Sequence, residues 1–525
     1  MGAVVLTATM LTGAGASTTH AKTTHAKTTH AKTSAANLRS AIVNGGTITV
    51  DFAGGAWPTL DPAPATAETS EQPIFSAIYG GLFEVTPKGA LAPELATGYS
   101  VSKNGLIVIL HLRHGVKFQD GSPFNAAAVK FNFQRDASPS VGCLCQPFLT
   151  AISSIGTPDK YTVVLHLSRK YSPILATLAT SMATFIVSPT SLARYGATTF
   201  GTHPVGAGPF EVVSDVPNAT LSLRRWRGYW DKGTPHVNQV QFVAVGTGTS
   251  AVSAVASGTA QIATGNAIGA SDISTAKTQG GVHVVVQSPL NYYWITMNQN
   301  IAPFNNIVAR QALYYATDSS VIAKSLLFGL GQSTQVLEGP GQAPFFGYKV
   351  AGFPAYDPTK AAALVKQLGG LSFTMQTIAN SPVFVELADA LQKMWQQAGI
   401  TVTLNILAHP AAVNNLITGN LQAQLDIYGI YLDPDLSLQT IIRCHATINK
   451  AYCNPAVDNL LTKIEGTYDS KTQLKYYNQL FKIVNNTDFA AIPLTSLPSA
   501  YIESPKLHGV PNTPFLYLND AYLTK

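Results

Sequence analysis

Apolar and polar residues along this chain follow two different patterns. Residues 161–167 (YTVVLHL) and 400–407 (ITVTLNIL) are short runs rich in β-branched and apolar side chains, which predicts strands. Residues 383–399 (VFVELADALQKMWQQAG) carry apolar side chains at helical spacing, which predicts a long amphipathic helix. Because such strands and helices alternate from about 290 to 490, the pattern favours an α/β architecture.

The first half of the chain predicts further elements. A β-rich run at 47–54 is followed by a short helix over about 71–79. Asn104-Gly105 lies between two extended runs and predicts a hairpin, and Asn125 predicts the cap of the helix after it. The residues expected to pack inside this region are Val116, Phe118, Val129, Phe131 and Phe133.

The N-terminus differs from the rest of the chain. Residues 1–16 are apolar and then small, as in a secretory signal, which predicts an exported protein. Residues 17–45 contain three Thr-His-Ala-Lys-Thr repeats and read as a disordered tether with almost nothing to bury. The repeat histidines could hold a metal loosely, although a His-rich tract is only a compositional pointer to that chemistry.

The charge balance excludes one class of function. Charged residues make up 11% of the chain, and its net charge is +6. Three of the 33 basic residues are repeat lysines, so the remainder carries 30 basic and 27 acidic residues, or +3. A balance this even and scattered does not form a phosphate-binding surface, so no nucleic-acid partner is expected.

Catalytic motifs are missing from the sequence. It contains no zinc-protease helix motif, phosphate-binding Gly-Lys-Ser loop or nucleophile elbow, so no catalytic residue, cofactor or metal site is predicted. The glycine-rich residues 245–260 lack a lysine and predict the small-residue start of a helix. Asp433 and Asp435 could serve as an acid–base pair, but an Asp-Pro-Asp turn is more typical of a helix cap.

Four cysteines leave several arrangements open. The spacing of Cys444 and Cys453 suits a loop-closing disulfide, whereas Cys143 and Cys145 are separated by a single residue. An exported chain favours one or two disulfides. A zinc site built from all four cysteines would require the two pairs to meet in space.

One long segment resembles a known family. Residues 91–135 (LAPELATGYSVSKNGLIVILHLRHGVKFQDGSPFNAAAVKFNFQR) are similar to the signature of the family 5 extracellular solute-binding proteins, the peptide, dipeptide and nickel receptors of ABC importers. Five similar blocks follow in the family's order, at 204–210, 225–235, 291–318, 453–469 and 490–502. The family also has members with a disulfide just before Asn-Pro, which matches Cys444 and Cys453.

The resemblance implies a two-lobed periplasmic-binding-protein fold of type II, with an extra subdomain and a hinge of two crossovers near Pro289 and Ile492. Lobe I would comprise 46–78, 198–290 and 491–525, the extra subdomain 79–197, and lobe II 291–490. The implied function is that of a monomeric, non-enzymatic receptor that binds a peptide or another small solute and delivers it to an ABC permease. A sensory or scavenging binder of the same fold and an extracellular hydrolase are the alternatives.

The resemblance also locates a ligand cleft. Residues 426–435 (DIYGIYLDPD) are similar to the family's cleft segment, in which an aspartate before Tyr-Pro-Asp-Pro holds the amino terminus of a peptide. Ile430 takes the place of that aspartate, and an isoleucine cannot neutralise an ammonium group. The candidate ligand contacts are Trp57, Tyr292, Trp294, Tyr428, Gly429, Ile430, Tyr431 and Asp433, although each aromatic residue could equally be part of the core.

Overall fold

The computed structural model describes residues 44–525 except 66–67, 88, 266, 288–290, 337–349, 380–381, 429–431 and 447–448. The expected signal and all three repeats therefore lie outside the described residues. The same is true of Pro289 and of the candidate contacts Gly429, Ile430 and Tyr431. None of the described helices is both long enough and apolar enough to cross a bilayer.

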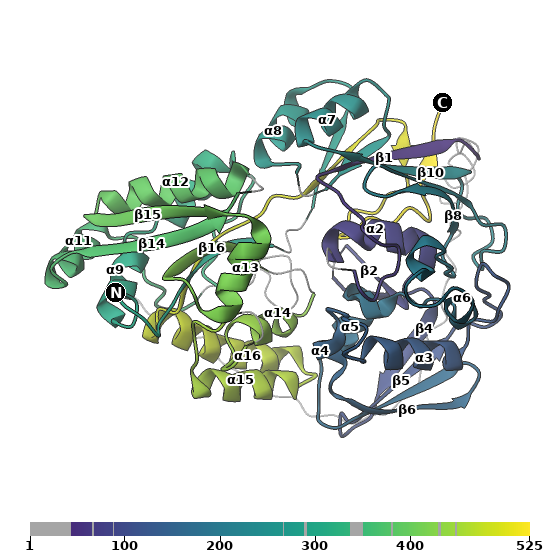
Figure 1. Ribbon diagram of the computed structural model, residues 1–525, viewed down its shortest axis with the longest axis horizontal. Coiled ribbons are helices and arrows are strands. Elements are labelled where there is room, and N and C mark those ends of the chain that lie inside the picture. The colour runs from purple at the N-terminus through teal and green to yellow at the C-terminus, as the bar shows by residue number, and fades with distance from the viewer. Residues whose placement is uncertain are drawn as a thin grey trace, which may run out of the picture. The chain divides into compact units, whose positions relative to one another are not determined.

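A seven-stranded mixed sheet forms one part of the fold, in the order β12-β18-β11-β1-β10-β9-β8. Its central strand β1 (Thr47–Ala53) is parallel to both neighbours, and the other pairs are antiparallel. Helices α7 (Gly248–Ala256) and α8 (Ala270–Thr278) pack against this sheet (Figure 1). The remaining strands are β8 (Phe210–Val216), β9 (Thr220–Arg225), β10 (Gln239–Val245), β11 (Ile262–Thr264), β12 (His283–Val286) and β18 (Ala500–Glu503).

The glycine-rich residues 245–260 include the start of a helix, α7, as predicted. Thr247 caps α7, because its hydroxyl oxygen accepts a hydrogen bond from the backbone N–H of Ser250 at 3.2 Å. The small residues of α7 and α8 then pack closely against the sheet, in a buried cluster with Ala53 and Ile502.

An antiparallel four-stranded sheet, in the order β4-β5-β7-β6, makes up a second part. Its strands are β4 (Ala96–Val101), β5 (Ile107–Leu112), β6 (Ile152–Asp159) and β7 (Thr162–Leu167). The helices near it are α3 (Ala126–Asp136), α4 (Gln146–Leu149), α5 (Ile174–Thr180) and α6 (Pro189–Tyr195), with the 3₁₀ turns η1 (Met182–Thr184) and η2 (Phe200–Thr202). The predicted hairpin joins β4 to β5, where Gly105 has a positive φ of 69°.

The packing predicted for this region is correct except at one position. Asn125 caps α3 by accepting a hydrogen bond from the backbone N–H of Ala128 at 3.0 Å. Val129 and Phe133, one helical turn apart, are buried, and so are Val116 and Phe118. Phe131 was expected in the core but is 40% exposed, because it lies two residues from each of them and faces the other side of the helix.

The third part is a five-stranded sheet in the order β15-β14-β16-β13-β17. Its strands are β13 (Tyr292–Met297), β14 (Leu371–Ile378), β15 (Ile400–Leu407), β16 (Ala423–Tyr428) and β17 (Ala491–Ser496). Helix α12 (Pro382–Gln396) runs along β14 and β15 (Figure 1). The other helices are α9 (Ile307–Tyr315), α10 (Ser319–Val321), α11 (Pro358–Gln367), α13 (His409–Thr418), α14 (Pro434–Ile441), α15 (Pro455–Glu465) and α16 (Ser470–Phe481), with the π-helical turns η3 (Ile322–Leu326) and η4 (Lys482–Thr487).

Alternation along β13 divides the core of this part in two. Tyr293, Ile295 and Met297 belong to one buried cluster with α12, while Trp294 belongs to a second cluster with α14, α15 and α16. Smaller elements complete the chain: helix α2 (Glu68–Tyr79) and the two-stranded pairs β2 (Phe83–Val85) with β3 (Leu91–Pro93) and β19 (Leu507–His508) with β20 (Tyr522–Leu523). Mixed sheets and helices confirm the predicted α/β class.

Two crossovers connect the seven-stranded and five-stranded sheets. One runs from β12 to β13, and the other runs from β17 to β18. They lie side by side, because the backbone N–H of Gln287 donates to the carbonyl of Ser499 at 2.9 Å and that of Leu497 donates to Asn291 at 2.7 Å. Ile492, expected at the hinge, is instead buried within β17, which pairs with β13 as far as Ser496. The second crossover therefore follows Ser496.

Both pairs of cysteines form disulfides. Cys444 is bonded to Cys453 with an S–S distance of 2.05 Å, which confirms the predicted bridge. Cys143 is bonded to Cys145, although a single residue separates them. The alternative of one zinc site from all four cysteines is wrong, since the two pairs are bonded separately.

Candidate functional site

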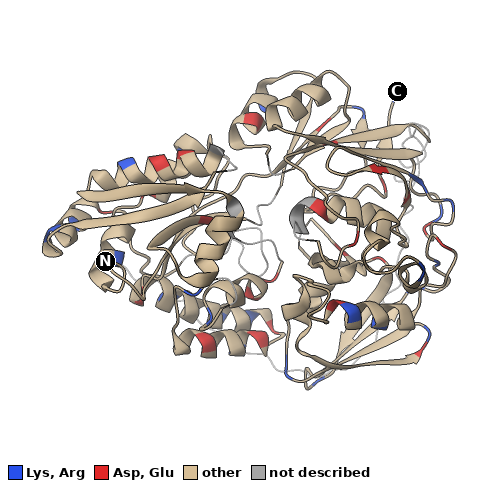
Figure 2. Cartoon of the chain, viewed as in Figure 1, with Lys and Arg blue, Asp and Glu red and all other residues tan. Residues whose placement is uncertain are grey.

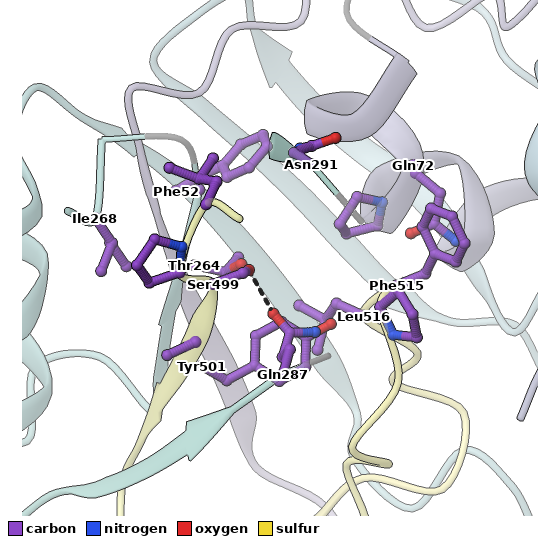
Figure 3. Close-up of a pocket in the computed structure, with 16 residues that line it drawn as sticks. Phe52, Gln72, Thr264, Ile268, Gln287, Asn291, Ser499, Tyr501, Phe515 and Leu516 are labelled. Carbon is purple, nitrogen blue, oxygen red and sulfur yellow. Dashed lines mark hydrogen bonds between the residues drawn. The ribbon is translucent and has the colours of Figure 1, made fainter. Parts of the chain in front are cut away.

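A cavity of about 100 Å³ lies where the two crossovers meet the seven-stranded sheet (Figure 3). Its walls come from β1, α2, β11, both crossovers and residues 514–516 near the C-terminus. This volume is well above the minimum that one enclosed water needs, so the cavity has room for several waters. It is therefore large enough for one ring or one residue of a solute.

One wall of the cavity is fixed by paired polar groups. The hydroxyl of Ser499 donates to Oε1 of Gln287 at 2.8 Å (Figure 3). Nε2 of Gln287 donates to the carbonyl of Thr513. The hydroxyl of Tyr501 also donates to Thr513, at 3.2 Å, and burial raises the pKa of this phenol above its usual range. These bonds tie both crossovers to the C-terminal segment.

A second wall carries side-chain amides whose oxygens have no such partners. Gln72 comes from α2 and is 4% exposed, and Asn291 immediately precedes β13. Oε1 of Gln72 and Oδ1 of Asn291 are buried and make no hydrogen bond within the part of the chain that the structure describes. Both side chains line the cavity. The sequence gives no local signal for either residue, because they lie more than two hundred positions apart.

Trp57, a candidate contact, lies behind the cavity wall. It is fully buried, and its ring stacks against Phe52, a lining residue, at a centroid distance of 6.4 Å. Its Nε1 donates to Oδ1 of Asp215 at 2.9 Å. Burial raises the pKa of Asp215, and this hydrogen bond acts in the opposite direction. In this arrangement Trp57 supports Phe52 and is not itself among the lining residues.

Tyr292 and Trp294 lie in β13, which is flanked by β16 and β17 in the five-stranded sheet, and each is 1% exposed. Tyr292 is paired in register with Tyr428 of β16 and with Ser496 of β17. The structure thus brings the candidate residues Tyr292 and Tyr428 together in neighbouring strands. Tyr292 directly follows Asn291, which lines the cavity. Their contact with a ligand stays a prediction.

Asp433 caps α14, as the helix-cap interpretation expected. Its Oδ1 accepts from the backbone N–H of Asp435 at 3.0 Å, and the hydroxyl of Tyr477 donates to the same oxygen at 3.4 Å. Burial raises the pKa of Asp433 to about 6. The pKa of Asp435 is raised well above its usual range, first by burial and then by the charges of Glu465 and Asp433.

A charged contact between distant segments was not predicted. Glu465 at the end of α15 is 2% exposed and forms ion pairs with Arg169 and with Arg443, the latter at 2.7 Å. The backbone N–H of Ser172 donates to the carbonyl of Glu465 at 2.7 Å. Arg169 and Ser172 follow β7 of the four-stranded sheet, whereas Glu465 belongs to the part with the five-stranded sheet. We call this group of four residues the Glu465 contact.

Further hydrogen bonds surround the Glu465 contact. Nε2 of Gln439 donates to the hydroxyl of Tyr171 at 3.2 Å, and Nε2 of Gln473 donates to the hydroxyl of Ser172 at 3.0 Å. The hydroxyl of Tyr468 lies 3.4 Å from the carbonyl of Gly105 in the hairpin of the other part. The part with the four-stranded sheet and the part with the five-stranded sheet are thus joined here by charged and polar groups.

The seven-stranded and five-stranded sheets, joined by two adjacent crossovers with a cavity at the junction, have the architecture of a hinged solute receptor. The model of the bacterial extracellular solute-binding proteins, family 5 (middle region), matches residues 90–447. This chain belongs to that family and is the solute-binding component of an ABC importer. The family is extracellular and is made up of binding proteins of transporters.

Relatives and solved structures agree with this assignment. The glutathione-binding protein GsiB of Escherichia coli O1:K1 is 30% identical over 350 residues, which cover 66% of this chain and 67% of that protein. GsiB of Salmonella typhi is 30% identical over 357 residues, covering 67% and 68% of the two chains.

Two solved structures share the fold. DppA from Helicobacter pylori in complex with the peptide STSA has a TM-score of 0.79 at 22% identity, covering 93% of this chain and 100% of that one. AgaA from A. tumefaciens R10 in complex with agropinic acid has a TM-score of 0.78 at 24% identity, covering 91% and 99%.

Proposed function

We propose that this receptor binds a peptide-like or other small oligomeric solute with one end in the cavity at the crossovers, and that ligand binding closes two lobes. Residues 46–78, 198–290 and 491–525 would form lobe I, with 79–197 as its extra subdomain, and 291–490 would form lobe II. The exception within 491–525 is β17 (Ala491–Ser496), which pairs with β13 and so would belong to lobe II. The observation that carries the proposal is the position of the cavity, which is lined by both crossovers.

Closure follows from that position by a simple physical argument. A ligand that contacts both lobes stabilises the closed form by its differential affinity for the two forms, and a membrane permease can recognise the closed form. The proposed partners are therefore the ligand and an ABC permease, and the receptor itself acts as an exported monomer. Relatives named for glutathione and structures holding peptides or agropinic acid support a small solute.

We further propose that the receptor has no catalytic activity of its own. Among the described residues, the cavity lining includes no Asp, Glu, His, Lys, Arg or Cys, so these residues offer no acid–base pair or activated nucleophile. Lys and Arg are scattered over many elements of the described chain and are not gathered on one face (Figure 2). That distribution agrees with a receptor for a small solute and with the absence of a nucleic-acid partner.

The test combines unfolding with solution scattering. Thermal unfolding is measured with di- to pentapeptides, glutathione, oligosaccharides and nickel chelates, because a ligand at 100 times its Kd raises the free energy of unfolding by about 2.7 kcal/mol. X-ray scattering with the same ligand should show a smaller radius of gyration. A stabilising ligand that leaves the radius of gyration unchanged would contradict closure.

A further inference from the structure

The Glu465 contact lies outside both crossovers. Arg169 and Ser172 belong to residues 79–197, the proposed extra subdomain, whereas Glu465 belongs to the proposed lobe II. Their bonds place the end of α15 beside the part with the four-stranded sheet (Figure 1). A rotation about the crossovers that moves lobe II away from the extra subdomain must break these bonds, so the contact belongs to a closed form.

Helix α14 extends the contact with apolar groups. Leu432 and Leu436 are buried in the same apolar cluster as Tyr171 of the extra subdomain. Leu438, later in the helix, belongs instead to the cluster of α14, α15 and α16 in lobe II. Because α14 packs against both parts, opening would also expose Leu432 and Leu436 to water, and their burial stabilises the closed form.

Three acidic side chains meet at this contact. Asp433 and Asp435 lie at the start of α14, and Asp435 is fully buried beside Glu465. Arg169 and Arg443 are the cations that pair with Glu465. If all five groups were ionised, three negative charges would face two positive ones. A proton held by one of the acids removes the excess charge, which is costly to keep in a buried site.

The extra subdomain covers these acids. Tyr171 is 1% exposed, and its hydroxyl accepts a hydrogen bond from Nε2 of Gln439 at 3.2 Å. Burial raises the pKa of Tyr171, and the charge of Asp435 raises it further, as expected when the phenol and the carboxyl group lie close together. Opening of the lobes takes Tyr171 away and lets water reach the acids.

Closing therefore changes how tightly the acids hold protons. In the closed form burial raises the pKa of Asp435 well above its usual range and that of Asp433 to about 6, whereas an aspartate in water has a pKa of about 3.9. The closed form thus binds more protons than the open form, so it is favoured at low pH and loses this advantage as the pH rises through 6 and above. Tyr468, Tyr477 and Lys170 also lie at the contact, but phenols and amines ordinarily titrate near about pH 10.

We propose that the Glu465 contact is an acid-favoured latch, which holds the extra subdomain on lobe II at low pH and releases it as the pH rises. This inference rests on the proposed function and adds a regulation of lobe closure. The unliganded receptor then spends more of its time closed at about pH 5 than at about pH 8. A ligand that binds only the closed form is bound more tightly in acid, since its apparent affinity scales with the fraction of receptor that is closed.

X-ray scattering of the full, unliganded chain at pH 5 and pH 8 tests the latch. Asp435→Asn keeps the shape of the protonated acid and cannot ionise, and its matched control is Asp389→Asn, because Asp389 is exposed in α12. Arg169→Ala removes the ion pair between the two parts, and its control is Arg224→Ala, whose ion pair lies within one sheet.

The radius of gyration of the unaltered protein should be larger at pH 8 than at pH 5, because one proton changes the ratio of closed to open receptor by up to about tenfold per pH unit. Asp435→Asn should lose most of this change and keep the smaller radius. Arg169→Ala should have a larger radius than the unaltered protein at pH 5. Both control variants should match the unaltered protein.

A radius of gyration that is the same at both pH values in the unaltered protein, or that changes equally in Asp435→Asn, would overturn the latch. If Asp435→Asn does not fold, Arg169→Ala decides, and a radius equal to that of the unaltered protein at pH 5 would overturn it. These measurements use no ligand, so the latch can fail while ligand-driven closure stands. At pH 8, where the latch is weakest, a stabilising ligand should still reduce the radius, and a failure there counts against the proposed function.

Discussion

The cavity at the crossovers and the Glu465 contact both bring together segments from different parts of the molecule, but their chemistry is opposite. The lining of the cavity carries no charged side chain among the described residues. The Glu465 contact places one buried carboxylate between two arginines. An uncharged cavity is suited to an uncharged part of a ligand, whereas a carboxylate that is already neutralised is suited to holding two segments together.

Filling the cavity should have the largest effect, and it should act on binding. In Ile268→Trp the larger side chain occupies the space meant for the solute, so we expect at least about a hundredfold loss of affinity, or about 2.7 kcal/mol. Ile268 is 6% exposed, so overpacking should also lower the free energy of unfolding by about 1–3 kcal/mol. Calorimetry and thermal unfolding measure the two quantities.

The control for this variant is Ile417→Trp, because Ile417 in α13 is 41% exposed. It should change neither affinity nor stability by more than about 0.5 kcal/mol. Retained affinity in a folded Ile268→Trp protein would show that the solute binds elsewhere.

Neutralising Glu465 should act on stability. In Glu465→Gln both arginines lose their charge partner, although the substitution also removes a negative charge near Asp435. We therefore expect the free energy of unfolding to fall by about 1–3 kcal/mol, less than for an isolated buried pair. Urea unfolding checks this, with exposed Glu386→Gln in α12 as the control. Equal effects in the two variants would mean that the Glu465 contact holds nothing together.

Much of the local structure was predictable, because the signals are short. Asn104-Gly105 produces a hairpin, and Asn125 and Asp433 cap helices through bonds to residues two or three positions away. Phe131 was misplaced because an alternating pattern was read into a helix, where residues two apart face different sides. Hairpin turns, helix caps and the face on which a helical residue lies all depend on residues a few positions away in the sequence.

The two functional regions could not be predicted in this way. Arg169 and Glu465 are 296 positions apart, and nothing in either local sequence names the other. Gln72 and Asn291 meet at one cavity only because α2 and the first crossover adjoin the same sheet. The family resemblance predicted a hinge of two crossovers, the second of them near Ile492. Because β17 pairs with β13 as far as Ser496, that crossover begins after Ser496.

The protonation of Asp433 predicts a pH dependence that the uncharged cavity does not have. Its pKa is about 6 in the folded protein and about 3.9 in the unfolded chain. Between about pH 4 and pH 6 the folded state therefore binds more protons, so the stability from this group is present below pH 4 and is lost as the pH rises through 6. The loss should be about 1–2 kcal/mol, because Asp433 is partly exposed.

Asp433→Asn isolates this contribution, since asparagine caps a helix as well as aspartate does. Relative to the unaltered protein, the variant should gain stability as the pH rises from 4 to 7. Urea unfolding across that range provides the measurement. A difference that stays constant with pH, or that changes in the other direction, would show that Asp433 titrates at its ordinary value.

The smallest effect is expected from Arg169, and it tests how the charge of Glu465 is shared. The Arg169 side chain is 42% exposed, so its ion pair is screened by solvent, and Arg443 still neutralises Glu465 when Arg169 is removed. Its guanidinium also lies 4.6 Å from the centre of the Tyr171 ring, which adds a weak attraction. Arg169→Ala should therefore lower the free energy of unfolding by about 0.5–1 kcal/mol. The more exposed pair of Arg224 and Glu211 supplies the control, where Arg224→Ala should cost less than about 0.5 kcal/mol. If urea unfolding gave Arg169→Ala as large an effect as Glu465→Gln, Arg443 would not share the charge, and the contact would depend on the single pair that joins the two parts.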